Sequence, residues 1–390
     1  MKKKLAILGS TGSIGSILLS LINKKKFEIV ILSANKDYKK ILLQANLFNV
    51  KNIIINDQTS FLKAIDINKN KKIRIFNKNY DLKKIIKKKI DYTMSSITGI
   101  DGLKPTFEII KFTKKIAIAN KESLICAWPL INKELKKNNT EFVPVDSEHF
   151  SIWTDIKRNS HLNIDKIYLT ASGGPLLNYD KKQINKANIS SILNHPTWKM
   201  GKKISVDSAT MMNKCFEVME AKNIFNFKYN QIKILIHPDS YVHAIVVYRS
   251  GISKIITHDT TMKIPIFNSL YGDTKSYKIN NEIDIIKLNN LNFQNVDLKK
   301  FPMIKCLKIL SNTHTLYDTI IVSTNDCIVN KFLEKKINFK DIPRLIFNFL
   351  DKRKYKKYKK IVVTSIDDII DLNKLIKSDI NQYFLKNYEK

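Results

Sequence analysis

Short apolar segments of strand length recur through the first 147 residues and alternate with segments long enough for helices. Most of these segments are apolar at successive positions, a pattern typical of strands buried on both faces of a parallel sheet. The helices between them supply the crossover connections that parallel strands need. The apolar segments are residues 4–8, 27–32, 52–55, 90–94, 115–119 and 141–145. The pattern therefore predicts an α/β fold that opens with a doubly wound parallel sheet over residues 1–147.

The pattern changes after residue 147. Strand-like segments are now interleaved with polar loops, which predicts an α+β domain over residues 148–270. These segments are residues 166–170, 232–236, 244–248 and 254–257. Residues 271–300 are rich in Asn and Asp and are interpreted as a linker. Over residues 301–390 apolar side chains recur at helical spacing, as at Leu307 and Leu310, so we expect an α-helical C-terminal domain.

A glycine-containing turn follows the first apolar segment. Gly9, Gly12 and Gly15 stand at its end, and an apolar pattern of helical spacing runs from Ile14 to Ile22. Glycines permit close backbone approach, and the start of the helix offers N–H groups to a pyrophosphate, as in Rossmann-like domains. The spacing G-x-x-G-x-x-G differs from the more familiar G-x-G-x-x-G, and such a motif is weak evidence outside its strand-and-helix context. We interpret residues 1–147 as a dinucleotide-binding domain.

We expect residues at the end of the second strand to determine whether the cofactor is NADPH or NADH. Ser33, Asn35 and Lys36 stand there and offer donors to a 2'-phosphate, which favours NADPH. Asp37 lies about twenty residues beyond the glycines, where an NAD-type acid would bind a ribose hydroxyl. The residues favour NADPH and leave the Asp37 alternative open.

Oxygen ligands and phosphate donors occur together in two places in the middle of the chain. In an extended segment Asp146 and Glu148 point the same way, because side chains two apart share a face. On a helix Asn213 and Glu217 share a face, with Lys214 beside them. Carboxylates without nearby His or Cys ligands suit Mg²⁺ or Mn²⁺ better than zinc. We expect a divalent-metal site beside a small phosphorylated substrate.

The same residues also have a purely structural interpretation. Glu148 and Glu217 would then be surface charges, and Ser208 a helix N-cap. A histidine beside such carboxylates is more often a hydrogen-bonding partner than a ligand, so His149 receives no role.

Composition limits the possible partners. The 390 residues include Lys+Arg 68 against Asp+Glu 35, a formal net charge of +33 that suggests nucleic-acid binding. Only five of these cations are Arg, the residue on which specific base and phosphate contacts rely. The abundance of Lys, Asn and Ile is typical of AT-rich coding, so we expect no nucleic-acid partner. Four scattered cysteines form no disulfide pattern, and no apolar segment is long enough for a signal peptide or a membrane span. We expect a cytoplasmic protein.

Seven sequence blocks, in this order, resemble those of 1-deoxy-D-xylulose 5-phosphate reductoisomerases. They are LGSTGSIG (8–15), ANKESL (119–124), PVDSEH (144–149), ASGGP (171–175), HPTWKMG (195–201), KISVDSATMMNK (203–214) and IHP (236–238). The blocks span the first two predicted domains, while the last ninety residues resemble the family only loosely. The resemblance implies an NADPH- and Mg²⁺- or Mn²⁺-dependent enzyme of the non-mevalonate isoprenoid pathway. It would convert 1-deoxy-D-xylulose 5-phosphate to 2-C-methyl-D-erythritol 4-phosphate, as a homodimer.

The resemblance also implies roles for individual residues. The metal ligands would be Asp146, Glu148 and Glu217, which with His195 and Lys214 form the catalytic group. The substrate contacts would be Lys121, Ser147, Ser172, His195, Ser208, Asn213 and Lys214. The cofactor contacts would be Thr11, Gly12, Ser13, Ile14, Asn35, Lys36, Asn120, Glu122 and Gly201.

Three departures from the family pattern are visible. Asn35 and Cys215 each stand where the family usually has Gly, and residues 323–327 read STNDC where Ala-Ala-Asn-Glu is usual, which leaves a role for Asn325 open. Two other classes of protein remain as alternatives: a metal-dependent phosphosugar isomerase or aldolase without redox chemistry, and a basic nucleic-acid-binding protein. Loss of NADPH absorbance on adding 1-deoxy-D-xylulose 5-phosphate and Mg²⁺ distinguishes the reductoisomerase from the isomerase.

Overall fold

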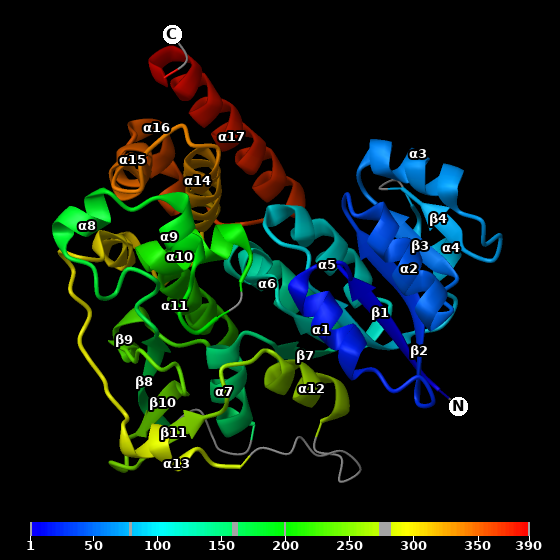
Figure 1. The fold of residues 1–390 in the computed structure, drawn as a ribbon, viewed down its shortest axis with the longest axis horizontal. Coiled ribbons are helices and arrows are strands. Elements are labelled where there is room, and N and C mark those ends of the chain that lie inside the picture. Colours follow the sequence, from blue (N-terminus) through cyan, green and yellow to red (C-terminus); the bar gives the residue numbers. More distant parts are fainter. Residues whose placement is uncertain (1, 78–79, 158–162, 199, 273–281, 389–390) are drawn as a thin grey trace. The chain divides into compact units, whose positions relative to one another are not determined.

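The structure is a computed structural model, and it describes residues 2–77, 80–157, 163–198, 200–272 and 282–388 (Figure 1). The chain forms two compact units. The first comprises Met1–Asn120, Ile131–Asp146 and Met262–Ile279. The second comprises Lys121–Leu130, Ser147–Thr261 and Asn280–Lys390. Each unit is therefore assembled from separate stretches of sequence.

The first unit contains a seven-stranded sheet in the order β4-β3-β2-β1-β5-β6-β7, with all neighbouring strands parallel. Its strands are β1 (Lys3–Leu8), β2 (Phe27–Ala34), β3 (Asn52–Ile55), β4 (Arg74–Phe76), β5 (Ile90–Ser95), β6 (Thr113–Ile118) and β7 (Glu141–Pro144). The six predicted strands and the doubly wound parallel sheet are confirmed. The sequence pattern missed β4, because this edge strand has only three residues and none of them is fully buried.

Helices cover the sheet of the first unit. They are α1 (Ser13–Leu21), α2 (Tyr38–Phe48), α3 (Gln58–Ile67), α4 (Leu82–Ile85), η1 (Ile100–Gly102), α5 (Leu103–Ile110) and α12 (Lys263–Tyr271). Leu5 and Ile7 of β1 and Leu18 of α1 are fully buried in one apolar core, where each contributes about 1.5–3 kcal/mol. The late helix α12 joins this core, and the Tyr271 hydroxyl donates to the carbonyl of Leu21 at 2.7 Å. Residues 262–272 thus pack with the dinucleotide-type sheet.

The second unit contains a four-stranded mixed sheet in the order β11-β10-β8-β9. Its strands are β8 (Ile164–Ala171), β9 (Ile232–Ile236), β10 (Val242–Tyr248) and β11 (Ser253–Thr257), and they confirm the four predicted segments. Two helices, α7 (Ser147–Ile156) and α11 (Met212–Phe225), bury apolar residues against it, among them Ile152 and Val218. The expectation of an extended chain through Glu148 was wrong, because Ser147 begins α7 directly after β7.

The rest of the second unit is mostly helical. It contains α8 (Lys181–Asn185), α9 (Ile189–Leu193), α10 (Lys202–Thr210), η3 (Tyr229–Gln231), α13 (Ile285–Asn289), η4 (Pro302–Ile309), α14 (Leu316–Leu333), α15 (Asp341–Leu350), α16 (Arg353–Lys356), η5 (Lys357–Lys360) and α17 (Ile366–Tyr388). The largely buried α14 packs against α15 and α17, which confirms the helical C-terminal region (Figure 1). The predicted linker, residues 271–300, includes α13 and a bridge between Gln294 and Ile236. Its residues 273–281 lie outside the described part. The exact domain boundaries stay a prediction.

Helix α6 (Lys121–Lys137) is divided between the two units. Its backbone leaves the helical conformation at Ala127 (φ −133°), two residues before Pro129. Lys121–Leu130 belongs to the second unit, and the remainder to the first. Among the described residues, no helix is both long enough and apolar enough to cross a membrane.

Candidate active site

The glycine turn of the first unit has the geometry of a phosphate cradle. Gly9 has φ +85°, and a Cβ there would lie 2.7 Å from the carbonyl oxygen of Ser96. A Cβ at Gly15 would lie 2.5 Å from the carbonyl oxygen of Gly9. Gly12, the N-cap of α1, is more open, since the nearest atom to a Cβ there would be 3.4 Å away. The first and last glycines are therefore required for packing, while exposed Gly12 and Ser13 leave the start of α1 accessible to an anion.

Two candidates for cofactor selection, Lys36 and Asp37, follow the end of β2, and their contacts differ. Asp37 caps α2, where its carboxylate accepts from the backbone N–H of Lys40 at 3.1 Å. The Lys40 ammonium donates to the carbonyl of Thr11 at 2.7 Å and so ties α2 to the glycine turn. Asn35 and Lys36 are exposed at the same edge. Because the Asp37 carboxylate already caps α2, the geometry favours Lys36 over Asp37 as the residue that selects the cofactor.

Asn120 and Glu122, two of the predicted cofactor contacts, also have structural partners. The Asn120 carboxamide donates to the carbonyls of Ile97 (2.5 Å) and Gly99 (2.9 Å), so it joins two loops at the carboxyl edge of the sheet. The Glu122 carboxylate accepts from the ammonium of Lys203 at 3.2 Å.

Three carboxylates that the sequence predicts as metal ligands are close together. Asp146 follows β7, Glu148 lies in the first turn of α7, and Glu217 projects from α11. One oxygen from each lies within 4.8 Å of the others. Hard divalent cations prefer oxygen ligands, and these three neighbouring carboxylates offer only oxygen.

Two lysines and an asparagine surround this group. The Lys214 ammonium lies 2.6 Å from Glu148 Oε1 and also contacts Glu217. Asn213 donates to Glu217 as well, and the Lys121 ammonium lies 2.7 Å from Asn213 Oδ1. Burial by itself would lower the pKa of Lys214, but the two glutamates outweigh burial and raise it. Lys214 in turn overcomes burial at Glu148 and lowers the pKa of that carboxyl, so Lys214 and Glu148 form an ionised pair.

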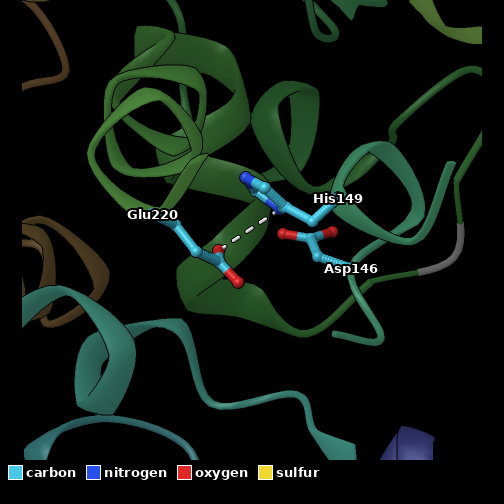
Figure 2. Close-up of side chains that lie close together, drawn as sticks. All are labelled: Asp146, His149 and Glu220. Carbon is cyan, nitrogen blue, oxygen red and sulfur yellow. Dashed lines mark ion pairs between the residues drawn. The ribbon is translucent and has the colours of Figure 1, made fainter. Parts of the chain in front are cut away.

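A second group shares Asp146 and is shown in Figure 2. The His149 ring lies close to the carboxylates of Asp146 and Glu220, with Nδ1 3.5 Å from Glu220 Oε2. Its Nε2 lies 2.8 Å from the carbonyl of Glu217, and because a carbonyl only accepts, Nε2 carries the hydrogen. The histidine thus joins α7 to α11 next to the three carboxylates.

His195 joins two of the predicted phosphate contacts. Its Nε2 lies 3.2 Å from the hydroxyl oxygens of both Ser172 and Ser208. Its Nδ1 accepts from the backbone N–H groups of Thr197 and Trp198 at 3.2 and 3.1 Å, so the hydrogen must be on Nε2. Burial lowers the pKa of His195 to about 4. At neutral pH this histidine is therefore an uncharged donor aimed at two hydroxyls.

Ser208 lies in the last turn of α10, so the structural interpretation of Ser208 as an N-cap was wrong. The turn that carries Ser172 packs against it: Gly174 has φ +71°, and a Cβ there would lie 2.8 Å from the carbonyl oxygen of Ser208. Met211 (φ +63°) separates α10 from α11, whose first turn contains Asn213 and Lys214. The structure thus brings four residues from two blocks, Ser172, Ser208, Asn213 and Lys214, to adjoining loops and helix ends.

Some residues near the site carried no sequence signal. His243 is buried, with its ring centroid 6.2 Å from that of Trp198 and 3.6 Å from that of His258. Burial, followed by the neighbouring His258, lowers the pKa of His243 to about 3. The Lys203 ammonium lies close to three carboxylates, and two of them, Glu122 and Asp326, come from distant parts of the sequence. Isolated histidines and lysines have no characteristic spacing, so only packing identifies them.

Comparison with known proteins gives a consistent result over almost the whole chain. Family profiles match residues 5–128 (1-deoxy-D-xylulose 5-phosphate reductoisomerase), 142–225 (1-deoxy-D-xylulose 5-phosphate reductoisomerase C-terminal domain) and 259–378 (DXP reductoisomerase C-terminal domain). A 1-deoxy-D-xylulose 5-phosphate reductoisomerase of Pelagibacter ubique (strain HTCC1062) is 52% identical over 97% of this chain and 99% of its own length. The enzyme of that name from Wolbachia pipientis wMel is 38% identical over 95% of both chains.

Solved structures agree in fold. A DOX-P reductoisomerase in complex with NADPH, fosmidomycin and magnesium superposes with a TM-score of 0.90 at 30% identity, covering 99% of both chains. The 1-deoxy-D-xylulose 5-phosphate reductoisomerase of Zymomonas mobilis in complex with NADPH gives a TM-score of 0.84 at 28% identity, covering 97% of this chain and 98% of the other.

Proposed function

The chain belongs to the 1-deoxy-D-xylulose 5-phosphate reductoisomerase family, and from that premise we propose how its own residues carry out the family's reaction. The protein is an NADP-dependent oxidoreductase that rearranges 1-deoxy-D-xylulose 5-phosphate and reduces the product to 2-C-methyl-D-erythritol 4-phosphate. Membership in this family excludes the alternative of an isomerase without redox chemistry. The observation that carries the assignment of roles is the convergence of Asp146, Glu148 and Glu217 beside Lys214.

The three carboxylates fit a magnesium or manganese ion, since they are close together and offer only oxygen, and two of them, Glu148 and Glu217, already contact a cation, the ammonium of Lys214. Such an ion supplies a Lewis acid to the adjacent carbonyl and hydroxyl oxygens of the substrate. Ser147 donates to Glu148 Oε2 at 2.6 Å and so orients one of the proposed ligands.

The phosphate of the substrate is assigned to Ser172, Ser208, Asn213 and Lys214. Asn213 and Lys214 offer amide and ammonium donors in the first turn of α11, where the helix dipole also favours an anion, and Ser172 and Ser208 add hydroxyl donors. The Nε2–H of His195 already donates toward both hydroxyls, so it holds them in place and leaves their own hydrogens for phosphate oxygens. Fixing the phosphate orients the reacting carbons, so remote binding energy contributes to catalysis.

The glycine turn and the end of β2 are assigned to NADPH. Thr11, Gly12, Ser13 and Ile14 stand at the open start of α1, and no Cβ at Gly12 narrows it. Asn35 and Lys36 are assigned to the 2'-phosphate. Asn120, Glu122 and Gly201 complete the proposed cofactor contacts.

Two further properties are proposed. A second copy of the chain is the expected partner, because β11 pairs only with β10 among the described strands and exposes Ile255 beside Ile252. All four cysteines are free thiols, as expected in a reducing compartment, and we propose a cytoplasmic location.

The function is tested by following NADPH absorbance with 1-deoxy-D-xylulose 5-phosphate and Mg²⁺. The metal ligands are tested with Glu217→Gln, which should weaken Mn²⁺ binding and lower turnover while the Kd for NADPH stays nearly unchanged. Glu220→Gln, on the same helix, is the matched variant. If Glu220→Gln weakens Mn²⁺ binding and Glu217→Gln does not, the ion is held by the group that contains His149, and the assignment fails.

A further inference from the structure

The first part of α6 is a short helical segment with an unusual anchorage. Pro129 has no N–H, so the carbonyl of Ile125 cannot make its normal bond four residues ahead, and the backbone already departs from the helix at Ala127. The carbonyl of Ile125 instead accepts from His314 Nε2 at 2.7 Å and from the side chain of Asn223 at 3.3 Å. Side chains of the second unit therefore hold this segment at its C-terminal end.

At its N-terminal end the segment presents two adjacent charged residues. Lys121 extends to the active-site cluster, with its ammonium 2.7 Å from Asn213 Oδ1 and 3.5 Å from Glu217 Oε1. Glu122 instead accepts from Lys203 in the first turn of α10. Because the two are neighbours in one helical turn, the direction of Lys121 depends on how Glu122 is held.

Lys203 holds more than Glu122. Its ammonium also lies 2.9 Å from Asp207 Oδ2, one turn further along α10, and 2.7 Å from Asp326 Oδ1 on α14. The other oxygen of Asp207 accepts from the buried side chain of Asn325 at 2.8 Å. A single ammonium therefore joins α6, α10 and α14, and two of its surrounding residues come from the segment 323–327 that departs from the family pattern.

The buried charges around Lys203 restrict how the residues of this cluster can be arranged. Burial by itself would lower the pKa of Lys203, but the three carboxylates raise it well above its ordinary value, so the ammonium stays charged. A buried ammonium with several carboxylates contributes little net stability, because desolvation offsets the attraction, yet it strongly favours one arrangement of its partners. That property suits a group that orients neighbours.

We propose that Lys203 is a positioning residue for Lys121: by binding Glu122, Asp207 and Asp326 together, it orients the first turn of α6 so that Lys121 reaches Asn213 and Glu217. The inference rests on the proposed function, in which that cluster binds the substrate. Lys203 itself touches neither the proposed metal ligands nor the proposed phosphate contacts in the described contacts.

A double-mutant cycle tests the inference. Lys203→Met should lower kcat/KM for 1-deoxy-D-xylulose 5-phosphate by about ten-fold, and adding it to Lys121→Met should lower kcat/KM by no more than about two-fold further, because residues that act through one another are not additive. Lys202→Met removes the same charge from an exposed position next to Lys203 and should leave kcat/KM unchanged. Equal losses from Lys203→Met with and without Lys121 would overturn the proposal.

Two measurements separate positioning from a general loss of stability. Calorimetric binding of fosmidomycin gives the same cycle without turnover, and the melting temperature of each variant reports folding. If Lys203→Met does not fold, Asp326→Asn replaces it, with a smaller loss that again disappears in the Lys121→Met background. Lys203→Arg keeps the charge and several donors and should recover most of the activity. If these variants have a lower melting temperature but unchanged kcat/KM and fosmidomycin affinity, Lys203 is not a positioning residue. If the unmodified protein does not oxidise NADPH, the proposed function is wrong instead.

Discussion

Lys36 and Asp37 are adjacent in sequence, and the side chain of Asp37 is already engaged as the N-cap of α2. We therefore expect Lys36→Ala to raise the KM for NADPH far more than the KM for NADH, because it removes the charge proposed to meet the 2'-phosphate. Lys39→Ala removes an equally exposed charge from α2 and is the control. Binding of 2',5'-ADP and 5'-AMP measures the effect without turnover. A preference of the unmodified enzyme for NADH would instead assign the selection to Asp37.

Lys214 contacts two of the proposed metal ligands, Glu148 and Glu217, and is itself a proposed phosphate contact. Charge-assisted hydrogen bonds contribute about 1.5–3 kcal/mol each, so Lys214→Ala should lower kcat/KM by about ten-fold or more. The affinity for fosmidomycin should fall in parallel. Steady-state kinetics and inhibitor titration measure the two effects, with Lys202→Ala as the control. If both quantities are unaffected, the phosphate is bound elsewhere.

At the scale of the element, α14 contains a buried carboxyl whose ionisation opposes folding. Burial raises the pKa of Asp318 from 3.8 to about 7, although Lys222 partly offsets the effect. The groups near it also include His314, whose Nε2 lies 3.9 Å from Asp318 Oδ2, and Cys126, Tyr229 and Cys306. The folded protein holds this proton more tightly than the unfolded chain, so the Asp318 contribution to the free energy of unfolding falls as pH rises from about 4 to about 7.

Asp318→Asn cannot ionise, so we expect its melting temperature to decline less between pH 5 and pH 8 than that of the unmodified protein. Thermal unfolding at a series of pH values measures the slope. Asp371→Asn, at an exposed position on α17, is the control. Identical slopes for the unmodified protein and Asp318→Asn would contradict the prediction.

At the scale of the whole molecule, assembly is expected to depend on one edge strand and on net charge. Ile255→Lys places a charge on the exposed edge strand β11 and should shift the protein from dimer to monomer, whereas Ile286→Lys adds the same charge on α13 and should not. Each chain carries a formal charge of +33, so salt should strengthen the dimer by screening repulsion. Analytical ultracentrifugation at low and moderate ionic strength measures both effects. A dimer that persists in Ile255→Lys places the interface elsewhere.

The sequence by itself determined the elements whose signals are local. The six apolar segments of the first unit and the four of the second became strands, because burial on a pleated sheet requires apolar side chains at successive or alternate positions. The glycine turn could also be predicted from the sequence. The crowded backbone around Gly9 and Gly15 leaves no room for a Cβ, so the sequence has to carry glycine there. The candidate site residues could be predicted because they occupy positions that match the sequence blocks of the family.

Only the tertiary structure decided which distant residues meet. Glu148 lies in the first turn of a helix and does not extend β7, and α12 belongs to the first unit, although neither fact is visible in the local sequence pattern. Lys203 meets Asp326 across more than a hundred residues, and His314 satisfies the carbonyl that Pro129 leaves without a donor. Local periodicity records whether a residue is buried, but the partner of a buried charge or carbonyl is chosen by packing, because each such group must be paired with whatever the folded chain brings near it.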